Sequence, residues 1–278
     1  MGLAALTVPM IPGLIWLWII YRTDRYEPEP KRLVAMTFGL GVLSIVPAFF
    51  GERLGEQLYP YLGTIESATA APLGEITNPI PLFIACFLII GPCEELAKFL
   101  AVRLVMFRNR EFDEPLDGLI YAAAAALGFA SLENVFYVVD FQHGATIRWG
   151  MLGVRSFLAL PGHVIFAAMW GYALGRKKFD PTFRVWPYLL LAAGLHGLYD
   201  FLLMYPPIRP AIILYMTLMV PVVLRQIRVL RADSPFAPGA VAAVALATAN
   251  SPSPAAVDPA ALPPSAPDDP SSGLPPAA

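Results

Sequence analysis

Seven stretches of mostly apolar residues dominate this sequence, and each is long enough to cross a lipid bilayer as a helix. The hydrocarbon core is about 30 Å thick, so a membrane-spanning helix needs about 20 predominantly apolar residues. Lipid offers the backbone no hydrogen bonds, and a helix satisfies its own. The sequence therefore predicts an all-α fold, a polytopic membrane helix bundle with about seven transmembrane helices, near residues 3–21, 33–50, 80–106, 118–139, 150–174, 185–204 and 210–226.

The composition supports the same class. Of the 278 residues, 57% are hydrophobic and only 14% are charged, whereas soluble domains carry about 25% charged residues. The net charge of −2 offers no basic surface, so we expect the lipid bilayer as a partner and no nucleic acid. The first apolar stretch has no basic segment before it and no small-residue cleavage site after it, so we interpret it as a retained span. The expected location is the cell membrane, with multiple passes.

The distribution of Lys and Arg predicts the orientation of the spans. These residues gather in segments 22–32, 108–110, 176–184 and 225–231, which follow the first, third, fifth and seventh spans. The opposite side carries only Arg53, Arg148 and Arg209. Because cytoplasmic loops are enriched in Lys and Arg, we expect the N-terminus outside and the C-terminus in the cytoplasm.

Two regions follow from the change in composition along the chain. Residues 1–231 hold all the spans and form the expected membrane domain, with its longest outer loop at residues 51–79. Residues 232–278 are rich in Ala, Pro and Ser and contain no Lys or Arg. Such a segment cannot bury a core, so we expect a disordered tail.

Several ionisable residues lie inside the predicted spans, where each charge costs about 2.5–3.5 kcal/mol on insertion scales. At a rise of about 1.5 Å per residue, Glu94, His163 and His196 reach mid-membrane, and Glu133 and Asp200 lie nearer the outer face. Four helices therefore present polar groups to one another. The full set is Glu94, Glu95 and Lys98 in the third span, Glu133 beside Asn134 in the fourth, His163 in the fifth, and His196 and Asp200 in the sixth.

The spacing of these residues predicts specific pairs. Glu94 and Lys98 are four residues apart, an order that favours an ion pair on one helix face. His196 and Asp200 have the same spacing, so the carboxylate can orient the imidazole. Glu95 points about 100° away from Glu94, so the two glutamates need not share a role.

Other residues in the spans bear on packing. Pro92 removes a backbone hydrogen bond, so we expect a bend that opens space beside the glutamates. The glycines Gly128, Gly171 and Gly175 allow close approach between helices. Arg103 and Arg155 lie nearer the ends of their predicted spans, where such long side chains can extend to the membrane surface.

Two kinds of hydrolytic site and two non-catalytic roles fit this polar set. A buried glutamate can serve as a general base, and one glutamate with two histidines is a ligand set of catalytic zinc. Neither H-E-x-x-H nor G-x-S-x-G occurs. The alternatives are a proton or ion relay, as in transporters, and a silent scaffold in which the ion pairs only fix packing.

Four motifs resemble those of one family. The run EELAK, residues 94–98, resembles the EExxK motif of PrsW-type intramembrane proteases. Further similarity lies in residues 117–134, in Pro161–Gly162–His163, and in HGLYDF at residues 196–201. The resemblance covers about residues 10–205, and the family is related to the CAAX prenyl endopeptidase and bacteriocin-processing superfamily.

The resemblance implies a membrane-embedded endopeptidase. It implies that Glu94 or Glu95 activates water, that His163 and His196 act as metal ligands or oxyanion stabilisers, and that Glu133 and Asn134 polarise the carbonyl or complete a metal shell. The ligands of a zinc ion would be Glu94, His163 and His196, and catalysis without a metal stays open. The best-known members are bacterial and cut anti-sigma factors, which implies a membrane-anchored protein substrate and the bacterial plasma membrane.

Overall fold

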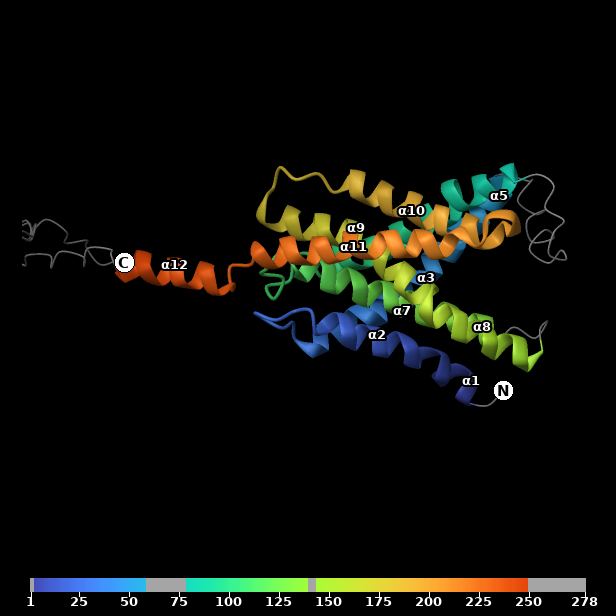
Figure 1. Ribbon diagram of the computed structural model, residues 1–278, viewed down its shortest axis with the longest axis horizontal. Helices are drawn as coiled ribbons and strands as arrows, with labels where there is room; N and C mark the ends of the chain where they lie inside the picture. Colours follow the sequence, from blue (N-terminus) through green and yellow to red (C-terminus); the bar gives the residue numbers. More distant parts are fainter. Residues whose placement is uncertain (1–2, 59–78, 140–143, 250–278) are drawn as a thin grey trace, which may run out of the picture. The chain divides into compact units, whose positions relative to one another are not determined.

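A computed structural model describes residues 3–58, 79–139 and 144–249 of the chain. It divides into two units, residues 1–237 and 238–278. The described residues are helical and contain no strand, and the first unit holds seven helices long and apolar enough to cross a membrane (Figure 1). The predicted all-α membrane bundle is therefore confirmed. The predicted orientation of the termini stays a prediction.

The seven spans match the apolar stretches, and three of them are interrupted. The first combines α1 (Leu3–Thr7), a 3-10 turn and α2 (Ile11–Tyr21), and the second is α3 (Lys31–Leu58). The third combines α5 (Ile80–Ile84), the π-helix η3 (Ala85–Ile90) and α6 (Gly91–Val105). The others are α7 (Asp117–Val139), α8 with α9 (Ala145–Phe157 and Ala159–Phe179), α10 (Trp186–Met204) and α11 (Ala211–Ala232).

Helix α7 forms the centre of the bundle. Its alanine run is completely buried, and glycines let its neighbours approach. A methyl group added at Gly128 would lie 2.0 Å from the Phe38 carbonyl oxygen of α3, and one at Gly171 of α9 would lie 2.6 Å from the Ala122 Cβ. The close packing expected at these glycines is confirmed. Because α7, α9 and α3 pack this tightly, polar side chains on their facing surfaces are held away from lipid.

A π-helix, η3, ends two residues before Pro92, where we expected a bend; the bend itself stays a prediction. Proline has no backbone N–H, and its ring crowds the carbonyl of the preceding turn. The Gly91 N–H donates to the Cys86 carbonyl, five residues earlier, which is the hydrogen-bond pattern of a π-helix. The wide turn packs against α10, where a methyl group at Gly197 would lie 2.6 Å from the same Cys86 carbonyl oxygen.

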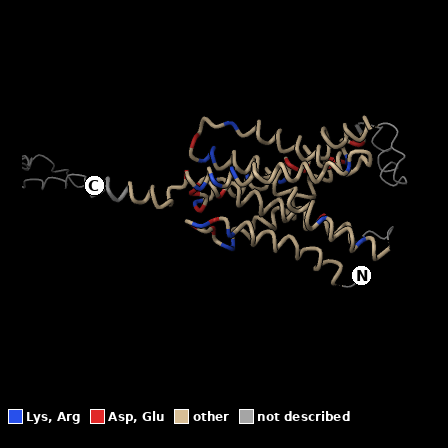
Figure 2. The backbone as a smooth tube through the Cα atoms, in the orientation of Figure 1, with Lys and Arg blue, Asp and Glu red and all other residues tan. Residues whose placement is uncertain are grey.

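Charged residues gather mainly at one end of the first unit, where α2 connects to α3 (Figure 2). Helical residues occur within the first part of the tail, whose predicted disorder stays a prediction. Helix α11 continues to Ala232, and α12 covers Pro238–Ala249. Alanine has the highest helix propensity, and proline suits the first turn of a helix, which accounts for α12. Residues 250–278 lie outside the described residues, as does most of the outer loop, residues 59–78.

Candidate active site

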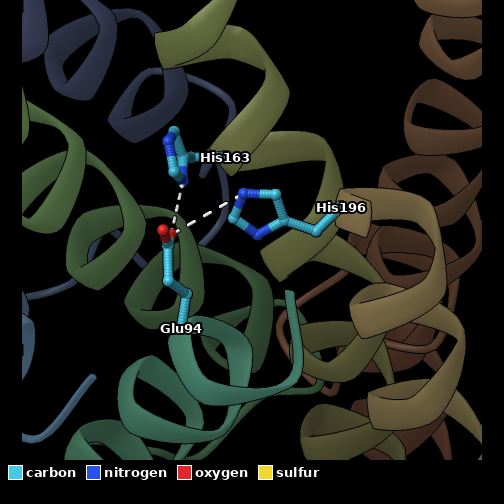
Figure 3. A group of neighbouring side chains, drawn as sticks. All are labelled: Glu94, His163 and His196. Carbon is cyan, nitrogen blue, oxygen red and sulfur yellow. Dashed lines mark ion pairs between the residues drawn. The ribbon is translucent and has the colours of Figure 1, made fainter. Parts of the chain in front are cut away.

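Glu94, His163 and His196 converge from three helices, α6, α9 and α10 (Figure 3). The Glu94 Oε2 atom lies 3.6 Å from His196 Nε2 and 3.9 Å from His163 Nδ1. One potential ligand atom from each residue lies within 4.8 Å of the other two. All three side chains are buried. We call these three residues the Glu–His centre.

Glu95 lies on a different side of α6 and holds His196 in place. Its Oε1 atom is 2.9 Å from His196 Nδ1 and 2.7 Å from Lys98 Nζ. Its Oε2 atom accepts a hydrogen bond of 2.9 Å from the Trp170 indole N–H. If His196 carries its proton on Nδ1, that N–H donates a hydrogen bond to Glu95. The other nitrogen, Nε2, then has a free lone pair and faces Glu94. Carboxylate–histidine pairs of this kind fix the tautomer and orientation of histidines that ligate metals.

The two glutamates also differ in access to space. Glu94 and Glu133 line a cavity of about 530 Å³ between α3, α6 and α7, whose other lining residues are Ile45, Val46, Phe49, Glu52, Phe129 and Phe136. Glu95 is fully buried and does not reach it. Glu52, expected in the outer loop, belongs to α3 because that helix continues beyond its apolar stretch. A larger hollow of about 1160 Å³ beside α2 and α3 contains none of the predicted site residues.

Lys98 neutralises much of the negative charge. Its Nζ atom lies 3.3 Å from Glu94 Oε2, which confirms the expected pair, and 3.1 Å from His163 Nδ1. It also lies 4.5 Å from the centre of the Phe129 ring. Because Lys98 is completely buried, its charge requires these partners.

Glu133 connects the Glu–His centre to a residue that sequence reasoning missed. Its Oε2 atom is 3.1 Å from His163 Nε2 and 2.9 Å from the Arg155 guanidinium. Arg155 Nε donates to Asn134 Oδ1 over 2.7 Å. Asn134 is therefore linked to His163 through two intervening residues, Arg155 and Glu133. Arg155, whose position allowed its side chain to extend to the membrane surface, is instead half-buried and contacts Glu133 and Asn134.

Asp200 lies near His196 but does not take the expected orienting role. Its Oδ2 atom is 3.5 Å from His196 Nε2, the same nitrogen that faces Glu94. The opposite nitrogen, Nδ1, is engaged by Glu95. Spacing along one helix could identify Asp200 as a neighbour of His196, but it could not show that a carboxylate from another helix comes closer.

The donor set fits a zinc ion. Zinc binds histidine nitrogen at about 2.0–2.1 Å in tetrahedral sites, so neighbouring ligand atoms lie about 3.4 Å apart. The separations of 3.6 and 3.9 Å from Glu94 to the two histidines are close to that value, and the ligand nitrogens of the two histidines lie within 4.8 Å of each other. Lys98 Nζ lies 3.1 Å from His163 Nδ1 and 3.3 Å from Glu94 Oε2, so Lys98 would have to move aside for a metal bound by those two atoms. Two imidazoles and one carboxylate also match the ligand types of catalytic zinc.

Comparison with known proteins identifies the family. The family model for the PrsW family intramembrane metalloprotease matches residues 29–225. The chain is 33% identical to Protease PrsW of Geobacillus kaustophilus over 196 residues, which cover 69% of this chain and 76% of that protein. It is 30% identical to Protease PrsW of Bacillus subtilis over 204 residues, or 72% and 83% of the two chains. No solved structure matches the chain.

The match spans all four elements that supply the Glu–His centre and its partners, α6, α7, α9 and α10. It favours a peptidase over the ion relay and the silent scaffold. It also agrees with seven apolar helices that carry buried carboxylates and histidines. The chain therefore belongs to the PrsW family of intramembrane metalloproteases and is a multi-pass peptidase of the bacterial cell membrane.

Proposed function

We propose that this protein hydrolyses a peptide bond in a membrane-anchored protein, with the Glu–His centre as its catalytic site. The observation that carries the proposal is the convergence of Glu94, His163 and His196 from three helices beside a cavity that Glu94 lines. A bundle gains no packing advantage from burying these groups. Their energetic cost in lipid favours a functional role.

The metal in this proposal is zinc, held by Glu94, His163 and His196. The family description as a metalloprotease supports a metal, and the two imidazoles with one carboxylate support zinc. A bound zinc ion supplies Lewis-acid chemistry, which polarises a carbonyl and lowers the pKa of water.

The surrounding residues then have distinct roles. Glu95 holds His196 by its Nδ1 atom, and Lys98 balances the charge of both glutamates. With Glu94 as a ligand, the carboxylate proposed to accept the proton of the attacking water is Glu133, which lines the same cavity and lies 3.1 Å from His163 Nε2. Its pair with Arg155 makes it a weaker base, so Arg155 would have to release it for this role. Without a metal, Glu94 itself is the base and the histidines stabilise the oxyanion.

The cavity supports a substrate that arrives as an extended segment within the membrane. Its walls are mainly apolar and belong to α3, α6 and α7. Such walls accept side chains of a transmembrane or juxtamembrane segment after it unwinds, since cleavage requires an exposed peptide bond. An anti-sigma factor is the substrate class to test first, because the family resemblance implies it.

A cleavage assay with purified protein and a tagged membrane peptide tests the site. We expect Glu94→Gln to lower the cleavage rate by about 10²–10⁴-fold, which is the usual contribution of a general base. We expect a loss of similar size if Glu94 is instead a metal ligand. The matched control is Glu56→Gln, because Glu56 forms an exposed pair with Arg53 on α3 and its loss should leave the rate unchanged. Cleavage by Glu94→Gln at the wild-type rate would refute the assignment.

Metal analysis of the same preparations separates the two mechanisms. With zinc as the cofactor, the wild type holds about one zinc ion, His163→Ala and His196→Ala lose it, and Glu133→Gln keeps it while losing activity. Full activity after complete removal of metal would favour Glu94 as the base. Proteomics of cells with wild type or Glu94→Gln then identifies the substrate as a membrane protein that is no longer shortened.

A further inference from the structure

A second group of acidic side chains lies buried away from the Glu–His centre. Asp24 belongs to the connection between α2 and α3, Glu114 to the connection between α6 and α7, and Asp117 is the first residue of α7. One carboxylate oxygen from each of the three lies within 4.8 Å of the other two. Glu29 lies beside them, and all four are buried. We call these four residues the acidic cluster.

Each member of the acidic cluster is held by hydrogen bonds from the surrounding chain. Asp117 Oδ2 accepts two bonds of 2.8 Å from the backbone N–H groups of Asp113 and Glu114. Asp24 Oδ2 accepts a bond of 3.0 Å from the Glu29 N–H. The hydroxyl groups of Tyr121 and Ser234 donate to Glu29 and Glu114, respectively.

The remaining oxygens have no such partners. Asp24 Oδ1, Glu29 Oε1 and Asp117 Oδ1 are buried without a hydrogen-bond partner, although unsatisfied buried polar atoms are rare in native proteins. In the part of the chain that the structure describes, no Lys or Arg forms an ion pair with the cluster. Arg231 and Lys178 lie close enough to act electrostatically on the cluster, but neither forms a contact ion pair with it. Several carboxylates are therefore buried together without a cation in direct contact.

The carboxyl groups also approach one another in pairs. Glu114 comes within hydrogen-bonding reach of Asp24, and Glu29 within that of Asp117. Two ionised carboxylates repel at this range unless a proton or a cation lies between them.

We propose that Asp24, Glu114 and Asp117, with Glu29 beside them, bind a hard divalent cation, Mg²⁺ or Ca²⁺. Carboxylate oxygens are the ligands these ions prefer, whereas imidazole favours zinc. The cation ties the connection between α2 and α3 to the start of α7, and through Ser234 to the end of α11. The site is distinct from the Glu–His centre in position and in donor type.

Thermal unfolding of the purified full-length protein tests the site without reference to activity. We expect MgCl₂ or CaCl₂ to raise the Tm by about 5–10 °C when the cation is a hundredfold above its Kd. The two salts are tested in separate arms, which identifies the preferred ion. The rise should persist in Glu94→Gln, because that variant leaves the acidic cluster intact.

Neutral variants assign the effect to the cluster. Asp24→Asn/Glu114→Gln keeps the size of both side chains and removes two charges, so its Tm should no longer respond to either salt. Asp113→Asn is the matched control: Asp113 is exposed in the same connection as Glu114, and only its backbone contacts Asp117. We expect the control to respond like the wild type.

Terbium luminescence provides a second measurement, because Tb³⁺ occupies oxygen sites for Ca²⁺ and Tyr121 donates its hydroxyl to Glu29. We expect tyrosine-sensitised emission that Ca²⁺ or Mg²⁺ displaces. If the double variant does not fold, Glu114→Gln decides by the same titration: weaker Tb³⁺ binding supports the proposal, and unchanged binding overturns it. The proposal is also overturned if the Tm of the wild type does not depend on either cation, or if the double variant responds like the wild type. In that case the paired carboxyl groups share protons instead of binding a cation.

Discussion

Glu94 and Glu95 are neighbours in the chain but belong to different environments. Adjacent positions of a helix point about 100° apart, so Glu94 lines the cavity while Glu95 faces α9 and α10. Every oxygen of Glu95 has a partner, among Lys98, His196 and the Trp170 indole. The roles proposed for the two residues therefore predict different consequences for the same substitution.

We expect Glu95→Gln to reduce both stability and activity. The amide removes a buried charge opposite Lys98 and cannot accept from both His196 and Trp170, so the free energy of unfolding should fall by about 3 kcal/mol. A poorly held His196 should lower the cleavage rate or the zinc affinity by about 10–100-fold. Thermal unfolding, zinc content and peptide cleavage check these effects.

Glu94→Gln provides the comparison for this prediction. It should lose more activity than Glu95→Gln and less stability, because Glu94 borders the cavity and has fewer close partners. A Glu95→Gln enzyme with wild-type stability and zinc content would show that the contacts of Glu95 do not hold His196 in position.

The chemistry of the candidate site could be predicted from residue types, but its contacts could not. Carboxylates and histidines at similar depth in four spans indicated one shared site, because charges in lipid face one another. The partner of His196 depends on how α6 and α10 are rotated, and the spacing within α10 suggested Asp200 where Glu95 is closer. Arg155 was missed because its depth depends on where α8 begins.

At the scale of helices, close contact of backbones determines how the site is assembled. Gly175 of α9 packs so tightly that an added methyl group would lie 1.9 Å from the Pro115 carbonyl oxygen. Backbone cannot move aside as a flexible side chain can. The position of α9, and with it His163, therefore depends on the absence of a side chain at this glycine.

We expect Gly175→Ala to lower the free energy of unfolding by about 1–3 kcal/mol through overpacking. Gly194→Ala in α10 is the control, because its added methyl group would meet no atom within 4 Å. That variant should be more stable by about 0.5–1 kcal/mol, since alanine favours the helix. Thermal or denaturant unfolding in the same detergent compares the two, and equal effects would contradict this account of the interface.

The spans could be predicted to within several residues, and their irregularities could not. Apolar stretches mark the membrane-embedded part of each helix, so α7 and α10 begin and end near the expected residues. The polar last turns of α3 extend beyond its apolar stretch to Leu58. The π-helix at residues 85–90 precedes Pro92 and packs against α10, and a proline in the sequence does not by itself predict this hydrogen-bond pattern.

At the scale of the whole bundle, the charge pattern predicts which surface faces the cytoplasm. Lys and Arg follow alternate spans, so the connection after α9 should be cytoplasmic and the segment before α8 external. Chemical labelling tests this in a Cys86→Ala/Cys93→Ala background, with one new cysteine at exposed Gly144 or Thr182. A membrane-impermeant maleimide should label Gly144→Cys in spheroplasts and Thr182→Cys only after lysis. The reverse pattern would show the opposite orientation.

Trp170 gives the protein an internal optical probe of its proposed catalytic site. Its indole ring is completely buried and nearly perpendicular to the ring of Phe99, and its N–H donates to the Glu95 carboxylate, which also contacts His196. A change of charge around His196 alters the electric field across the ring, which shifts the wavelength of tryptophan emission. A variant that keeps Trp170 and replaces Trp16, Trp18, Trp149 and Trp186 would therefore report metal or substrate arrival by fluorescence, without a turnover assay.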